Sequence, residues 1–163
     1  MQLRYFNQPH FENGSLKLIS QVLKEQGITK PLICTDPGLV AIGMTDKIRN
    51  LLSNELSPTF YTETPANPTE QAVNDALELY KQNGCDGVVG FGGGSSMDLA
   101  KAVALMANHE GNVVDYSVNE GGTGKIQETV PTVAIPTTSG TGSEVSLGAV
   151  IIMNDGRKLI LAS

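Results

Sequence analysis

The sequence predicts an α/β fold: a doubly wound, mainly parallel sheet with helices on both faces, followed by a C-terminal β-hairpin. Short β-rich runs alternate with amphipathic stretches of helical periodicity as far as Asn108. Repeated strand-then-helix order is typical of parallel sheets joined by right-handed crossovers. Near the end of the chain, Asn154-Asp-Gly156 separates two apolar runs, which is the turn chemistry of a hairpin.

Strands and helices alternate regularly in the first part of the chain. The strands that we expect are 3–6, 32–35, 59–61 and 87–91, and the helices are 16–26, 46–52, 70–82 and 97–108. Ser15, Thr45 and Thr69 precede three of these helices as side-chain caps, and Gly27 and Gly84 end two of them. Because 87–91 is apolar throughout, we expect it at the centre of the sheet.

The second part of the chain is less regular. We expect a flexible loop at 119–124, a strand at 131–136, and two hairpin strands within 146–153 and 157–161. No internal repeat or long linker interrupts the chain. Its 163 residues fit one domain of ordinary size, so we treat 1–163 as a single domain.

Charge and composition exclude several classes of function. Lys and Arg number 11 and Asp and Glu 17, so the net charge of −6 repels nucleic acid and anionic membranes. The N-terminus lacks the pattern of a signal peptide, and no apolar run reaches the ~18–20 residues that a membrane span needs. We therefore expect a cytoplasmic protein. Cys34 and Cys85 form no C-x-x-C pair and are expected to be buried free thiols.

A run of glycines follows the apolar strand directly. It reads Gly92-Gly-Gly-Ser-Ser-Met-Asp-Leu-Ala-Lys101 and opens a helix. Without Cβ atoms, the backbone amides at this edge of the sheet are open to an anionic group, and free N–H groups and the helix dipole both favour a phosphate there. The alternative is a tight turn in which Ser95 or Ser96 only caps the helix and Asp98 only complements its dipole.

The familiar nucleotide-binding and hydrolase motifs do not match this sequence. Neither Gly92-x-Gly94 nor Gly140-x-Gly142 is followed by the third glycine of G-x-G-x-x-G. Gly124-Lys125 lacks the spacing of a P-loop, and no serine lies in G-x-S-x-G.

A second run, Thr137-Thr-Ser-Gly-Thr-Gly-Ser-Glu144, also follows an apolar strand. Its hydroxyl groups can donate hydrogen bonds to phosphate, ribose or amide groups, and its glycines permit close contact. The alternative is an ordinary surface turn. If both runs lie at the same sheet edge, they bracket one elongated ligand.

Taken together, the two runs resemble the iron-containing (group III) alcohol dehydrogenases. Members of this family carry G-G-G-S-x-x-D-x-A-K and, farther on, P-T-T-x-G-T-x-S-E, and this chain matches both, over 92–101 and 136–144. The likeness extends over nearly the whole chain, through Thr35-Asp36 and Pro65-x-Asn-Pro-Thr69. The resemblance implies that this chain is a Rossmann-like N-terminal dinucleotide-binding domain. In the family, a helical metal-binding domain follows it.

The resemblance also implies a role for each matching residue. Asp36 would bind the adenosine ribose, and Asn67 would line the adenosine side. Asp98 would lie towards the nicotinamide and substrate end, and Lys158 would reach the nicotinamide ribose. The remaining implied contacts are with pyrophosphate for Gly93, Gly94, Ser95 and Ser96, and with adenine, phosphate or ribose for Thr137, Thr138, Thr141 and Ser143.

A carboxylate at Asp36 favours NAD over NADP, because it accepts hydrogen bonds from a free 2′-hydroxyl and repels a 2′-phosphate. Taken without the family, Asp36 before Pro-Gly is equally a turn residue, and Lys158 is equally an exposed strand lysine.

The family's metal ligands, an aspartate and three histidines, belong to the helical domain, and this chain stops before any of them. His10 and His109 match no ligand position, so we interpret both as polar surface residues and predict no metal site in this chain. An Fe2+ or other divalent ion would belong to the full-length enzyme only. Without it the substrate oxygen lacks a Lewis acid, and we expect this chain alone to be inactive.

Three functions remain open at this point. The first is the coenzyme domain of an enzyme that transfers hydride between an alcohol, aldehyde or ketone and nicotinamide. The second is a free-standing nucleotide-binding or regulatory module, and the third is a dehydroquinate-synthase-like NAD-binding domain, against which the 137–144 loop argues. The apolar edge strand at 3–6 further predicts a homodimer.

Overall fold

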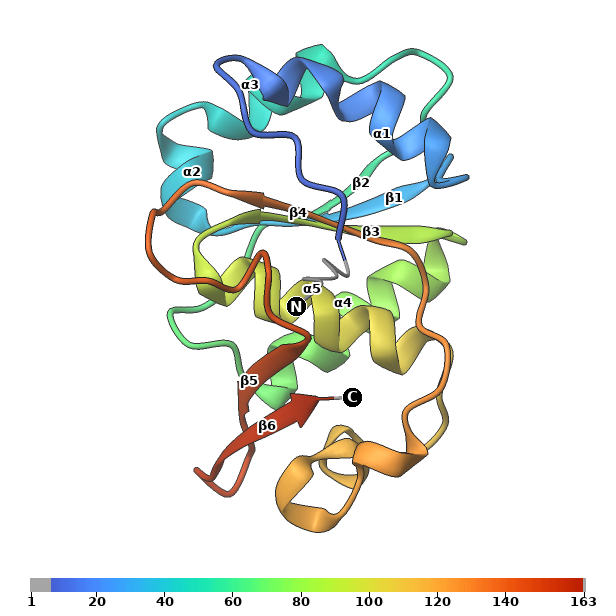
Figure 1. Ribbon diagram of the computed structural model, residues 1–163, viewed down its shortest axis with the longest axis vertical. Helices are drawn as coiled ribbons and strands as arrows, with labels where there is room; N and C mark the ends of the chain where they lie inside the picture. Colours follow the sequence, from blue (N-terminus) through green and yellow to red (C-terminus); the bar gives the residue numbers. More distant parts are fainter. Residues whose placement is uncertain (1–6, 163) are drawn as a thin grey trace, which may run out of the picture.

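The computed structural model describes residues 7–162, and its centre is a four-stranded parallel sheet (Figure 1). The order of the strands is β2-β1-β3-β4, and their bounds are Pro31–Cys34 for β1, Thr59–Tyr61 for β2, Gly87–Gly92 for β3 and Thr132–Pro136 for β4. Ile33 pairs with Phe60 on one side and with Val89 on the other. The predicted α/β class and the central position of β3 are both confirmed.

Helices cover both faces of this sheet, as the doubly wound prediction requires (Figure 1). One face carries α1 (Ile19–Glu25), α2 (Pro37–Ala41) and α3 (Met44–Leu51), and the other carries α4 (Glu70–Gln82) and α5 (Gly94–Ala107). Successive side chains of a strand point to opposite faces. Leu32 accordingly packs in the core on the α4 and α5 side, and Ile33 packs in the core on the α1 and α3 side.

Two of the three predicted side-chain caps differ from the prediction. Ser15 caps nothing, because Gly14 at φ 86° opens a 3-10 turn, Ser15–Leu18, ahead of α1. Thr45 is buried inside α3, whose cap is Gly43 at φ 76°. Both predictions relied on a hydroxyl where a glycine in the left-handed region makes the turn instead. Thr69 does cap α4, and its Oγ1 accepts from the Ala72 amide at 3.2 Å.

The start of α5 also differs, because this helix begins at Gly94, three residues before the predicted start at Met97. The short helix α2 was not predicted. Asp36 caps it, with Oδ1 accepting from the Leu39 amide at 3.1 Å, and Pro37 occupies the first position, where its missing N–H costs nothing.

The C-terminal part forms the predicted hairpin, with β5 (Gly148–Ile152) and β6 (Lys158–Ala162) antiparallel and separate from the main sheet. Ala149, Ile151, Leu159 and Leu161 bury it against the α5 side of the core. The expected loop at 119–124 is largely ordered into 3-10 turns, Val118–Glu120 and Thr123–Lys125, preceded by another at Val113–Tyr116.

Some of the remaining expectations can be compared with the structure and others cannot. Cys34 and Cys85 are free and buried, as expected. No helix within residues 7–162 is long and apolar enough to cross a bilayer. The predicted strand at 3–6 lies outside the described residues, so that strand and the homodimer inferred from it stay predictions.

Candidate functional site

The order of the strands places one crevice of the sheet between β1 and β3. From β1 the chain moves outward to β2 and then crosses to β3 on the other side, so the direction of winding reverses there. Ligands of open α/β sheets bind at such a reversal, beyond the carboxyl ends of the strands. Asp36 follows β1 at this point, and Gly93 follows β3.

A cavity of about 440 Å³ lies at this edge of the sheet. Its walls come from four segments of the chain that are distant in sequence. The lining residues are Asp36, Gly38, Leu39, Pro65, Ala66, Gly93, Ser95, Ser96, Thr137 and Thr138. Six of them were predicted as site residues: Asp36, Gly93, Ser95, Ser96, Thr137 and Thr138.

The first wall of this cleft is the turn from β3 into α5. Gly92 has φ 155°, and a Cβ there would lie 2.5 Å from the Ser96 hydroxyl oxygen and 3.2 Å from Asp36 Oδ2. Two residues earlier in the sequence, a Cβ on Gly90 would lie 2.8 Å from the Met97 Cα. The glycines therefore let α5 lie directly on β3, and this close packing fixes the position of its N-terminus.

The N-terminus of α5 has no side-chain cap. Gly93 is the cap residue, so no side chain accepts from the amides of the first turn. Such amides have no partner within the helix and can bind an external anion. Ser95 Oγ accepts from the Asn67 amide at 3.1 Å and so ties the loop at 65–68 to the same helix end.

The second wall is the loop that follows β4. Thr137 and Thr138 line the cavity and are exposed, and a Cβ on Gly93 would lie 3.4 Å from Thr138 Oγ1, across the cleft. The Thr137 amide donates to the Gly92 carbonyl at 2.9 Å, so the two walls touch where they leave the sheet.

The other predicted site residues lie outside the lining of this cavity. Asn67 is exposed, at φ 59°, and reaches the site through its amide. A Cβ on Gly94 would face Thr141 at 3.4 Å rather than Thr138. Lys158 is exposed on β6.

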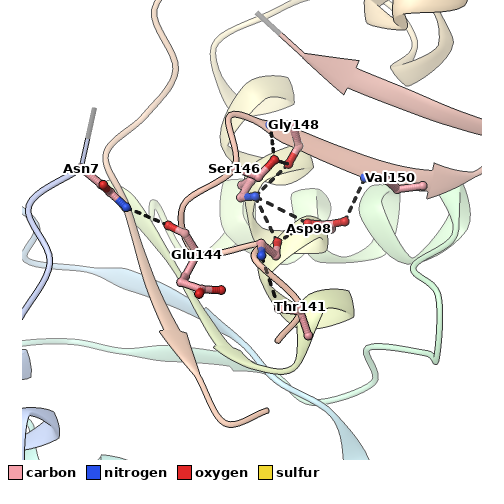
Figure 2. A network of polar contacts seen from close by, with 9 residues as sticks. Asn7, Asp98, Thr141, Glu144, Ser146, Gly148 and Val150 are labelled. Carbon is pink, nitrogen blue, oxygen red and sulfur yellow. Dashed lines mark hydrogen bonds and ion pairs between the residues drawn. The ribbon is translucent and has the colours of Figure 1, made fainter. Parts of the chain in front are cut away.

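Asp98 lies in a polar network one helix turn below the cleft (Figure 2). Ser143 and Lys101 belong to the same network. Ser143 Oγ donates to Asp98 Oδ1, and Val150 donates its amide to Asp98 Oδ2 at 3.0 Å. Donors of the same chain thus occupy both oxygens of this carboxylate.

Four lining residues were not predicted: Gly38, Leu39, Pro65 and Ala66. They adjoin predicted residues in sequence, since two follow Asp36 closely and two precede Asn67. The signal that would have found them is position: both pairs lie in the segments that follow the carboxyl ends of two neighbouring parallel strands, β1 and β2.

The histidines differ from the prediction in one respect. His109 is half-buried rather than a surface residue: its Nε2 accepts from the Gln127 amide at 2.9 Å, so Nδ1 carries the proton and donates to the Leu105 carbonyl at 2.7 Å. His10 is exposed. Within residues 7–162, no three His, Cys, Asp or Glu side chains come close enough to share a metal ion.

Comparison with known proteins shows the family. Residues 7–163 match the family of iron-containing alcohol dehydrogenases. The chain is 45% identical to a 4-hydroxybutyrate dehydrogenase of Cupriavidus necator, over 95% of this chain and 41% of that protein. It is 37% identical to an NAD-dependent methanol dehydrogenase of Bacillus methanolicus, over 85% of this chain and 36% of that one.

A solved structure shows the same fold. Sulfoacetaldehyde reductase from Bifidobacterium kashiwanohense, in complex with NAD+, superimposes with a TM-score of 0.84 and 30% identity, over 100% of this chain and 44% of that one. The chain thus spans about two fifths of the length of the curated relatives it matches. It is homologous to the NAD-binding part of these dehydrogenases, and it belongs to the iron-containing alcohol dehydrogenase family.

Proposed function

We propose that this chain is a single dinucleotide-binding domain that binds NAD in the cleft between the β3–α5 turn and the loop at 137–144. In the whole protein it would present the coenzyme for hydride transfer to or from an alcohol or aldehyde. One observation carries the proposal: four separate segments, containing six residues that the sequence had already suggested, line one cavity at the winding reversal of the sheet.

The start of α5 suits the pyrophosphate. Its first-turn amides lack a side-chain cap, and the positive end of the helix dipole favours negative charge there. Gly93 leaves room for close approach, and Ser95 and Ser96 line the cavity beside it. We assign the pyrophosphate to these groups and to Gly94.

Asp36 suits the adenosine ribose and favours NAD over NADP. Asp36 lines the cavity; its Oδ1 is engaged as the cap of α2, and its Oδ2 would lie 3.2 Å from a Cβ on Gly92. A carboxylate in this place accepts from a ribose hydroxyl and repels a 2′-phosphate. Thr137 and Thr138 would donate from the opposite wall.

Three residues would extend the site beyond the cavity as the coenzyme leaves it. Asn67 is assigned to the adenosine side, Thr141 to the loop contacts and Lys158 to the nicotinamide ribose. Asp98 and Ser143 underlie the loop towards the nicotinamide and substrate end.

The family uses NAD and a metal ion. The described residues do not fit a metal ion, so no step of this proposal uses one. When bound, NAD supplies the hydride acceptor, and the residues of this chain bind and orient it. We propose that this chain alone binds the nucleotide without turnover.

Calorimetric titration of NAD+ into the wild-type chain and a Gly93→Val variant tests the proposal. Gly93 has φ −76°, so its backbone accepts a side chain, and the valine methyls would extend towards Thr138 and narrow the cleft. We expect NAD+ affinity to fall by at least about ten-fold, or ~1.4 kcal/mol, with thermal stability nearly unchanged.

Gly124→Ala is the control, since a Cβ there meets no atom within 4 Å and should leave NAD+ binding unchanged. Equal affinity in the Gly93→Val variant and the wild type would contradict the proposed site.

A further inference from the structure

The loop at 137–144 has few bonds of its own. It contains no helix or strand, and residues 137–141 are exposed. Gly140 and Gly142 have φ values of 89° and 70°, which other residues rarely adopt. Its backbone bonds lie at its ends, from Thr137 to Gly92 and from Val145 to Gly142. Something else must hold this wall of the cleft in place.

One residue of the loop is buried. Ser143 is 6% exposed, and its hydroxyl donates to Asp98 and accepts from the Lys101 ammonium at 3.1 Å. Asp98 and Lys101 are separated by one turn of α5, with side chains only 16% and 18% exposed and 3.6 Å between Oδ1 and Nζ. The exposed loop is thus attached to the helix through a single buried hydroxyl.

The same two side chains also hold the chain beyond the loop. Lys101 donates to the Gly148 carbonyl at 2.8 Å. Asp98 accepts from the Val150 amide at 3.0 Å, as Figure 2 shows. The pair therefore fixes both the end of the loop and the start of β5. Hydrogen bonds in which one partner is ionised are stronger than neutral ones, so this attachment is strong for so short a segment.

Because α5 carries both this pair and the first wall, one helix sets the separation of the two walls. Its N-terminal turn forms one side of the cleft, and Asp98 and Lys101, lower on the helix, hold the other side through Ser143. We propose that Asp98 and Lys101 are positioning residues that hold the loop at 137–144 in the conformation that binds the coenzyme. They act through Ser143, without contact with the coenzyme. This inference rests on the proposed function.

The proposal predicts how substitutions should behave. A loop released from α5 must be ordered again when the coenzyme binds, and affinity falls by that cost. Burial lowers the pKa of Lys101, and the negative charges of Asp98 and Glu144 offset only part of that effect. Removal of the Asp98 charge should therefore lower the pKa of Lys101 further. Substitutions that act through the same contact should not add.

The test measures NAD+ affinity by calorimetry and amide hydrogen exchange of the free protein. We expect Lys101→Met and Ser143→Ala each to weaken NAD+ binding about ten-fold, and the double variant to weaken it no further. We expect exchange at residues 138–145 to rise about ten-fold while exchange in α4 stays the same. Lys101→Arg, which keeps the charge and the donors, should restore most of the affinity. Lys81→Met, at an exposed position of α4, is the control.

The outcomes separate this inference from the proposed function. If wild-type protein fails to bind NAD+, the proposed function is wrong, and the exchange data alone decide whether the pair holds the loop. If wild type binds and Lys101→Met binds equally well, the positioning role is overturned while the proposed function stands. Faster loop exchange with unchanged affinity would likewise overturn it, because the pair would then be structural only.

Discussion

The two walls of the cleft are built in different ways. The β3–α5 turn rests on a buried strand, all six residues of which are buried, and on glycines that bring the helix backbone into contact with the strand. The loop at 137–144 follows an edge strand with exposed ends and is attached to the helix through Ser143. Backbone packing fixes the first wall, whereas side-chain hydrogen bonds hold the second.

This difference has consequences for binding. The first wall carries the groups suited to phosphate, whose position must be defined before the ligand arrives. The second wall contributes hydroxyls on an exposed glycine-containing segment, which can adjust to the ligand at the cost of ordering. Overpacking at the base of the first wall, where α5 lies on β3, should therefore destabilise the domain, whereas damage to the second wall should weaken binding with little change in stability.

The largest effect is expected from Gly90→Val, which attacks the first wall at its base. A Cβ at this position lies 2.8 Å from the Met97 Cα and 3.1 Å from the Ala100 Cβ, so α5 must move away from β3. Overpacking of this kind costs ~1–3 kcal/mol, and we expect the upper end because the obstacle is backbone. Chemical denaturation would measure it. A loss of stability below about 0.5 kcal/mol would show that α5 is not held where we place it.

Much of the first wall could be predicted from the sequence, because its signals are local. An apolar run, three glycines and a helical pattern follow one another between Gly87 and Ala107. What failed there was the boundary: glycine is a poor helix former, yet Gly94 begins α5 because contact with β3 and the loop determines its conformation. Similarly, Gly14 and Gly43 occupy the cap positions ahead of the 3-10 turn before α1 and of α3, where Ser15 and Thr45 were expected to cap the helices.

For the second wall, the sequence predicted the kinds of residue in the loop but not the contacts that hold it. Hydroxyls and glycines at 137–144 indicated a ligand-binding loop, and Thr137 and Thr138 do line the cavity. The contacts that hold it join residues 42 to 52 positions apart, such as Lys101 with Ser143 and Asp98 with Val150. No local pattern specifies such pairs, so the role of Lys101 did not emerge from the sequence.

An intermediate effect is expected from Asp36→Asn, which alters the preference between NAD+ and NADP+ at the end of β1. The Asn side-chain oxygen can still cap α2, but the negative charge near the ribose is gone. Loss of a charged hydrogen bond to the ribose should weaken NAD+ binding by about 1.4 kcal/mol, or ten-fold. Loss of the repulsion between the carboxylate and the 2′-phosphate should improve NADP+ binding. Titrations with both nucleotides measure the ratio. Asp36→Ala, which also removes the cap, should in addition lower the melting temperature. An unchanged ratio in Asp36→Asn would exclude Asp36 from coenzyme choice.

The smallest effect is expected at the opposite end of the same strands, where Asp86 joins the start of β3 to the residues before β1. Its carboxylate accepts from the Thr29 hydroxyl at 2.6 Å and from the Lys30 amide at 2.8 Å.

Partial burial alone would raise the pKa of Asp86, but these bonds outweigh burial, and the pKa of the folded state is lowered. The ionised carboxylate therefore stabilises the fold above its unfolded pKa of ~3.9, and this contribution is lost as pH falls through the lower folded value. Asp86→Asn should cost at most about 1 kcal/mol at pH 7, since solvent screens the group, and the difference from wild type should shrink as pH falls below the unfolded pKa and through the lower folded value. Denaturation at a series of pH values measures it, with the exposed Glu55→Gln as the control. A larger loss at pH 7 would mean that charge, and not backbone packing alone, keeps β1 and β3 in register beneath the first wall.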